Sequence, residues 1–210
     1  MNRMVGEPNQ TMPPKRRACD QCRKPLSVCY CHLIKSHENH WPIEIIQHVG
    51  EKRHAIGTSR IAELSLTNIK VSEAKDNTPF TVDPAQSARW ENAVLIYPGA
   101  DSQDISALSG QAPRPLAFID GTWRKSKAIL LGSPFLQSLP RYSFQPHNDP
   151  RYRIRKAAQA DYFSTLEAIV TVLNSVERPS AKFSPLLDVM DWMIEQQLEF
   201  IKEKQGQTTF

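Results

Sequence analysis

Residues 115–123 read Pro-Leu-Ala-Phe-Ile-Asp-Gly-Thr-Trp, an apolar run that stops at an aspartate and a short polar turn. Residues 93–99, Ala-Val-Leu-Ile-Tyr-Pro-Gly, have the same design. Apolar runs that do not alternate with polar residues indicate strands buried on both faces, as in a parallel sheet. Each run is followed by a helical pattern, over 102–108 and 123–131. The chain is therefore predicted to be an α/β protein with a mostly parallel sheet flanked by helices.

The same alternation continues on both sides of these runs. The β-branched stretch 43–49 predicts the first core strand, a helix is expected to begin at Thr58 or Ser59, and 68–73 predicts another short strand. Residues 75–91 are expected to be a polar connection.

The last third of the chain predicts two helices. Ser164 followed by Glu167 is a capping box, which satisfies exposed backbone amides at a helix start, and this helix is expected to run to about Val176. Proline after Ser184 opens a second helix, over 184–204, because proline costs no hydrogen bond in the first helical turn.

Composition excludes an integral membrane protein. Of 210 residues, 40% are hydrophobic and 23% charged, which is typical of a globular domain. No apolar run reaches half the length of a bilayer crossing, and the first 17 residues lack the apolar core of a secretory signal. We therefore expect a cytoplasmic protein with no membrane contact, preceded by a disordered lead over residues 1–18.

All four cysteines of the chain, Cys19, Cys22, Cys29 and Cys31, lie within 13 residues. The spacing C-x2-C-x6-C-x-C is typical of a closed tetrahedral zinc site, which supports folding rather than catalysis. We predict a zinc knuckle over 19–35 that binds one structural Zn²⁺. The alternatives are an accidental cluster or a redox pair in Cys19 and Cys22, and His32 is expected to be a bystander.

Asp120, Thr122 and Trp123 are the candidate catalytic residues. Ligands of open α/β sheets bind beyond the carboxyl ends of the strands, where Asp120 is expected to lie. Trp123 offers a stacking face, and Gly121 allows a close backbone approach. In the alternative interpretation Asp120 only caps the next helix and Trp123 is part of the core. His48, His54 and His147 are expected to be hydrogen-bonded or surface histidines.

Positive charge concentrates after the tryptophan, although the net charge of the whole chain is only +4. Residues 141–156 hold five basic residues and one aspartate, with aromatic residues between them. Positive charge with stacking aromatics suits RNA, whereas the alternative is an ordinary solvated face. The predicted RNA-binding residues are Lys125, Lys127, Arg151, Arg153, Arg155 and Lys156.

Three motifs together resemble the DTW-domain family. They are the cysteine pattern, the strand-end Asp-Gly-Thr-Trp, and Tyr-Arg-Ile-Arg-Lys at 152–156 followed by Ser-Thr-Leu-Glu-Ala at 164–168. The resemblance covers about residues 19–177. The family includes tRNA-uridine aminocarboxypropyltransferases, which move the 3-amino-3-carboxypropyl group of S-adenosylmethionine to N3 of a uridine and release methylthioadenosine. The resemblance therefore implies a transferase that acts on tRNA with S-adenosylmethionine as donor.

The resemblance also implies a SPOUT-like, knotted catalytic domain over 36–210. SPOUT relatives are often dimers, but we expect a monomer, and the sequence indicates no obligate protein partner. Asp120 would be the base that acts on N3, or would bind the α-ammonium of the donor. The walls of the donor site would come from the loops at 97–99 and 139–144 and from the helix start at 164–167. The predicted cofactor-binding residues are Tyr97, Pro98, Gly99, Gly121, Leu139, Ser164, Thr165 and Glu167.

The chain departs from the family pattern at two places. Gln47-His48-Val49-Gly50-Glu51 stands where the family often has Gln-His-Pro-x-Glu, and Ala157-Ala158 stands where a proline often follows the basic segment. The alternative functions are a SPOUT-type RNA methyltransferase and a non-catalytic zinc-knuckle RNA-binding protein. The sequence leaves the modified uridine open.

Overall fold

The computed structural model describes residues 17–51, 57–145, 151 and 163–206. A six-stranded sheet has the order β2-β1-β5-β3-β6-β4, and every neighbouring pair runs parallel. Its strands are β1 (Ile43–His48), β2 (Ile69–Ala74), β3 (Val94–Ile96), β4 (Gln103–Asp104), β5 (Leu116–Asp120) and β6 (Arg141–Ser143). The prediction of a parallel α/β sheet is confirmed.

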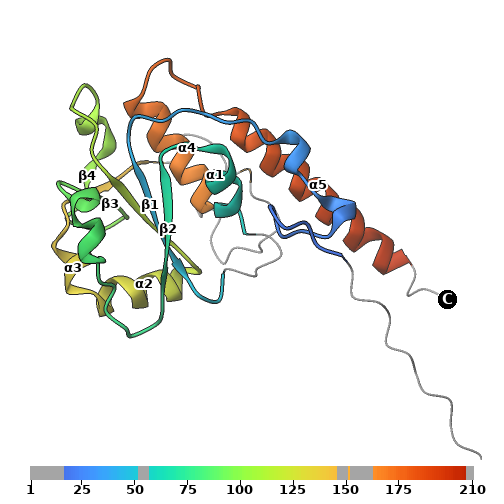
Figure 1. Cartoon of the computed structure of the whole chain (residues 1–210), viewed down its shortest axis with the longest axis horizontal. Coiled ribbons are helices and arrows are strands. Elements are labelled where there is room, and N and C mark those ends of the chain that lie inside the picture. Colours follow the sequence, from blue (N-terminus) through green and yellow to red (C-terminus); the bar gives the residue numbers. More distant parts are fainter. Residues whose placement is uncertain (1–16, 52–56, 146–150, 152–162, 207–210) are drawn as a thin grey trace, which may run out of the picture.

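Helices cover both faces of this sheet (Figure 1). They are α1 (Ser59–Ser65), α2 (Trp123–Gly132), α3 (Pro134–Ser138), α4 (Thr165–Val176) and α5 (Pro185–Gly206). Short 3₁₀ turns are η1 (Leu26–Val28), η2 (Cys31–Leu33), η3 (Pro84–Trp90) and η4 (Ile105–Leu108). The capping box of α4 forms as predicted, since the side chains of Ser164 and Glu167 each accept a backbone N–H of the other residue.

Two hydrophobic cores lie on the two faces of the sheet because side chains alternate along each strand. In β3, Val94 and Ile96 pack into the core with α1, α4 and α5, whereas Leu95 packs into the core with α2 and α3. β5 divides in the same way, with Phe118 in the first core and Ala117 in the second. This two-sided burial explains why the strands read as continuous apolar runs.

The predicted helix at 102–108 is wrong, because the segment forms β4 followed by η4. Asp104 ends the strand and caps the short turn by accepting the N–H of Ser106. The predicted loop 139–144 contains β6, whose strand form depends on pairing with β3 (Leu95 with Arg141) rather than on its own polar sequence. The polar connection 75–91 contains η3, and α3 was not predicted.

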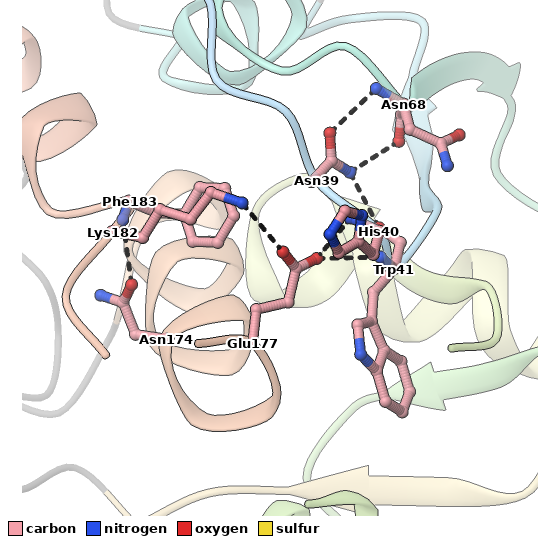
Figure 2. A network of polar contacts seen from close by, with 8 residues as sticks. All are labelled: Asn39, His40, Trp41, Asn68, Asn174, Glu177, Lys182 and Phe183. Atoms are coloured by element: carbon pink, nitrogen blue, oxygen red, sulfur yellow. Dashed lines mark hydrogen bonds and ion pairs between the residues drawn. The ribbon is translucent and has the colours of Figure 1, made fainter. Parts of the chain in front are cut away.

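A buried carboxylate joins the end of α4 to the segment that enters β1 (Figure 2). Glu177 is 4% exposed, and its Oε1 accepts the backbone N–H groups of His40 at 2.7 Å and Trp41 at 2.9 Å. Its other oxygen lies 3.3 Å from Nζ of Lys182. Asn39 continues the network to Asn68, before β2.

The knuckle segment lies along α5 (Figure 1). The ring of His32 contacts Trp192 of α5 edge-on at 5.4 Å, and Cys22 and Tyr30 belong to the core that α5 covers. Residues 1–16 lie outside the described residues, so the predicted disordered lead stays a prediction. The predicted knot also stays a prediction, because it depends on a path through 146–162, of which only Arg151 is described.

Candidate active site

The strand order places a topological switch point between β1 and β5. The chain leaves β1 through α1, which packs on one face of the sheet, and leaves β5 through α2, which packs on the other. The two connections lead toward opposite edges of the sheet. Open α/β sheets bind ligands in the crevice that such a divergence leaves at the carboxyl ends of the strands. Gln47 and Asp120 are paired in register at this point.

Asp120 is held there from two directions. Nε2 of Gln47 donates to Oδ2 of Asp120 at 2.8 Å, and the hydroxyl of Thr165 donates to Oδ1 at 2.6 Å. The amide of Gln47 also donates to Ser59 at 2.9 Å, which fixes its orientation. A carboxylate offers about four acceptor positions, so two contacts leave capacity for a ligand. Three elements, β1, β5 and α4, therefore orient one carboxylate at the switch point.

Asp120 does not cap α2. The N-cap of α2 is Thr122, whose hydroxyl accepts the N–H of Lys125 at 3.4 Å. The interpretation of Asp120 as a helix cap is therefore wrong, because Thr122 caps α2 instead.

Trp123 is 46% exposed, so the alternative that places it in the core is wrong. Its ring stacks on Tyr97, with 5.3 Å between centroids and 10° between planes. Tyr97 is buried at the carboxyl end of β3; burial raises the pKa of its phenol, and its hydroxyl lies 3.4 Å from that of Ser126. The pair forms an aromatic platform at the carboxyl end of β3, on the sheet face that α2 covers, and it is suited to a flat ring.

The two predicted glycines serve packing within the chain. A Cβ at Gly99 would lie 2.8 Å from a guanidinium nitrogen of Arg141, and a Cβ at Gly121 would lie 3.3 Å from Cβ of Lys125. Arg141 pairs with Asp101 at 2.7 Å across this loop. Gly99 and Gly121 thus allow Arg141 of β6 and α2 to approach the strand ends, and Pro98, which precedes Gly99, is exposed.

Lys125 forms an ion pair within the protein. Its ammonium lies 2.9 Å from Oε1 of Glu51, which is 5% exposed. Next to this pair, Nδ1 of His48 accepts the N–H of Gly50 at 2.9 Å, and its Nε2 lies 3.4 Å from Asp76. His48 is therefore a hydrogen-bonded histidine, as predicted, and Glu51 anchors the loop after β1 to α2.

At the start of α4, Glu167 is 3% exposed and accepts the backbone N–H groups of Ser164 at 2.7 Å and Arg151 at 2.6 Å. The guanidinium of Arg151 lies 3.0 Å from Asp191 of α5. Thr165 contacts Asp120, whereas Glu167 is used for capping and for holding Arg151.

The remaining predicted residues do not gather at the switch point. Leu139 precedes β6 and so lies at the amino end of the sheet, opposite to Asp120. Lys127 is an exposed residue of α2. Arg153, Arg155, Lys156, His54 and His147 lie outside the described residues.

The four cysteine sulfurs lie within 4.8 Å of one another and form no disulfide. The pairs Cys19–Cys31 and Cys22–Cys29 are each 3.6 Å apart. Zn–S bonds of about 2.3 Å in a tetrahedron place sulfurs about 3.8 Å apart, so the cluster fits a metal ion of this size. Backbone hydrogen bonds from Cys22 and Gln21 lower the pKa of Cys19 to about 6, which favours its thiolate, whereas burial raises the pKa of Cys31 to about 12. These cysteines could hold one metal ion.

Gln47 was not among the predicted site residues. Gln47 follows the apolar pair Ile45-Ile46 near the end of β1, as Asp120 follows the apolar run of β5, so the rule that identified Asp120 also applied to Gln47. Arg141 was missed because β6 was taken for a loop.

Comparison with known proteins matches the DTW domain to residues 16–198. The chain is 30% identical over 183 residues to tRNA-uridine aminocarboxypropyltransferase 2 of Drosophila melanogaster, covering 81% of this chain and 71% of that protein. It is 27% identical to the Macaca fascicularis protein of the same name, covering 79% and 59%. It is 22% identical to tRNA-uridine aminocarboxypropyltransferase A of Arabidopsis thaliana, covering 93% and 86%. No solved structure matches the chain significantly. No helix among the described residues is long and apolar enough to span a bilayer.

Proposed function

The chain belongs to the DTW-domain family, and we propose that it is a tRNA-uridine aminocarboxypropyltransferase. The relatives that carry this name support the activity. The structural observation that best supports this proposal is the carboxylate of Asp120, which Gln47 and Thr165 hold at the switch point. It has the position and the remaining acceptor capacity that a proton acceptor needs.

We propose S-adenosylmethionine as the donor, which supplies an electrophilic methylene carbon beside its sulfonium. The residues present fit such a ligand. The platform of Trp123 on Tyr97 suits an adenine ring, and Asp120 suits either the α-ammonium or the N3 proton of uridine. As the base, Asp120 would take the N3 proton of uridine; N3 would then bond to the methylene carbon while the carbon–sulfur bond breaks and methylthioadenosine leaves. Both reactants must be aligned for transfer. The two hydrogen bonds that orient Asp120 therefore support catalysis by fixing its position.

The metal at the cysteine cluster is proposed to be Zn²⁺ in a structural role. Four thiolates close a tetrahedral shell and leave no position for a substrate. The RNA surface is proposed to include the exposed Lys127 together with Arg151, Arg153, Arg155 and Lys156, whereas Lys125 acts through its ion pair with Glu51. A cytoplasmic location and a monomeric state stay predictions of the same proposal.

The test uses Asp120→Asn, which keeps the shape of the side chain and removes its charge. Transfer of label from the methionine arm of S-adenosylmethionine to unmodified tRNA is measured, with donor affinity measured separately by calorimetry. The matched control is Asp83→Asn, an exposed aspartate that caps η3 at the amino end of β3, where asparagine caps equally well. We expect transfer by Asp120→Asn to fall at least about a hundred-fold, the scale of general acid–base catalysis.

The two roles of Asp120 separate in this experiment. If kcat falls while donor affinity is unchanged, Asp120 acts on N3; if donor affinity falls, it binds the ammonium. Near-parental transfer by the variant would remove Asp120 from the reaction. Methyl transfer by the parent protein would favour the methyltransferase, and absence of donor binding would favour the non-catalytic RNA-binding protein.

A further inference from the structure

A cavity of about 440 Å³ lies between the zinc knuckle and the switch point. Its wall comes from three segments far apart in the sequence: knuckle residues 22–28, the end of β1 with the start of α1, and residues 193–200 of α5. Figure 1 shows the knuckle segment and α5 running side by side next to α1. The volume is within the range of sites that enclose small ligands.

The cavity reaches the candidate active site through Gln47. This residue lines the cavity and also donates to Asp120 at 2.8 Å. Its two amide hydrogens are used on Ser59 and Asp120, so its remaining polar atom is the carbonyl oxygen, an acceptor. A ligand group in this corner that donates a hydrogen bond, as uridine N3–H does, would bind this oxygen on the residue that itself donates to the carboxylate of Asp120.

The rest of the wall suits a nucleotide. Gln197 offers an amide that can pair with the polar edge of a base, and Met193 and Phe200 offer apolar surface. The amide of neighbouring Gln196 donates to Glu199 at 3.2 Å. The acids of the wall are paired with cations, because Glu63 contacts Arg60 and Glu51 contacts Lys125. Arg23 is an exposed cation at the same wall, suited to a phosphate.

The candidate donor site lies elsewhere. Tyr97, Pro98, Gly99 and Gly121 are absent from the residues that line this cavity. Asp120 does not line the cavity either; it is connected to it through the hydrogen bond from Gln47, and the aromatic platform lies at the carboxyl end of β3, the next strand.

We propose that this cavity binds the target uridine, turned out of the RNA, and that the zinc knuckle is one wall of this nucleotide site. The inference rests on the proposed function, since it assumes a tRNA substrate. Extrusion is what enzymes that modify a base require, because its reacting edge is otherwise paired or stacked. The role of zinc would then be to hold residues 22–28 in place against α5, so that they form a wall of the uridine site.

The first experiment blocks the cavity. Gln197→Trp fills it from α5, and Leu198→Trp is the matched control, since Leu198 is exposed on the same helix and does not line the cavity. KM for tRNA is expected to rise about ten-fold or more in Gln197→Trp, the scale of a lost base contact. Donor affinity and melting temperature should stay at the values of the parent, and Leu198→Trp should behave as the parent.

The second experiment locates the base directly. Transcripts of tRNA that carry 4-thiouridine are irradiated with the full-length protein, and cross-linked peptides are mapped by mass spectrometry. Cross-links to the peptides that contain 22–28 or 193–200 support the proposal. Loss of donor affinity in Gln197→Trp would overturn it by making the cavity the donor site, and an unchanged KM with cross-links elsewhere would overturn it as well. If the parent protein transfers no label to tRNA, the proposed function itself fails.

Discussion

Glu177→Ala should destabilise the fold more than its single carboxylate suggests. The substitution leaves the backbone N–H of Trp41 without a partner inside the protein, at a cost of about 1–3 kcal/mol for a buried donor. The N–H of His40 is only partly buried and can regain water, which adds about 1 kcal/mol. The ion pair with Lys182 is partly exposed and contributes little. The total is about 2–4 kcal/mol.

Thermal and urea unfolding measure this effect. A loss of that size lowers the melting temperature by about 5–15 °C in a chain of this length. Glu177→Gln keeps an acceptor for both amides and should lose about half as much, and Glu195→Ala, an exposed glutamate of α5, is the control. Equal stability of Glu177→Ala and the control would refute the reasoning. Equal losses in Glu177→Ala and Glu177→Gln would show that charge, and not the pair of hydrogen bonds, matters.

Three further predictions concern the aromatic platform, the metal, and Glu44, a buried carboxylate of β1. Burial raises the pKa of Glu44 although Arg89 opposes the shift, so the charged form is disfavoured in the fold. Glu44→Gln should therefore stabilise the protein most above the raised pKa. The gain should shrink as pH falls from the raised pKa toward the unfolded value of 4.5, and it should be absent below that value. Urea unfolding across pH measures this, and a pH-independent loss would contradict it. Trp123→Ala should weaken donor binding by calorimetry with a melting temperature close to that of the parent, because the ring is 46% exposed, and Trp123→Phe should restore binding. Chelation should release one zinc per chain, measured with a colorimetric indicator, and lower the melting temperature; release should be easier at low pH, because protons compete for the thiolates.

The sheet was predictable from sequence where strands are buried on both faces. The apolar runs that became β3 and β5 were recognised because tertiary burial and local pattern coincide there. β6 was missed, since Arg-Tyr-Ser carries one apolar residue and becomes a strand through its pairing with β3. The helix expected over 102–108 did not form, although its apolar residues have helical spacing. The segment is too short, and Asp104 caps a 3₁₀ turn at Ile105–Leu108 instead.

The candidate site was predictable only in part. Asp120 could be identified because it ends an apolar run, and the capping box of α4 because its motif is local. The partnership of Asp120 with Gln47 and Thr165 depends on strand order and on the placement of α4, and no local pattern encodes either. The cavity beside the knuckle depends on α5 returning to residues 22–28, which is likewise a property of the assembled fold.

α4 is fixed to the sheet at both ends, and this links stability to the candidate site. At its start, Thr165 donates to Asp120 at the carboxyl end of β5. At its end, Glu177 accepts the amides of the segment that enters β1, the strand that carries Gln47. Both donors to Asp120 therefore sit on elements that Glu177 joins. If β1 and α4 separate only on global unfolding, activity of Glu177 variants should follow the folded fraction alone. If transfer falls at temperatures where the fold is intact, α4 can loosen locally, and its position then sets the geometry of the carboxylate.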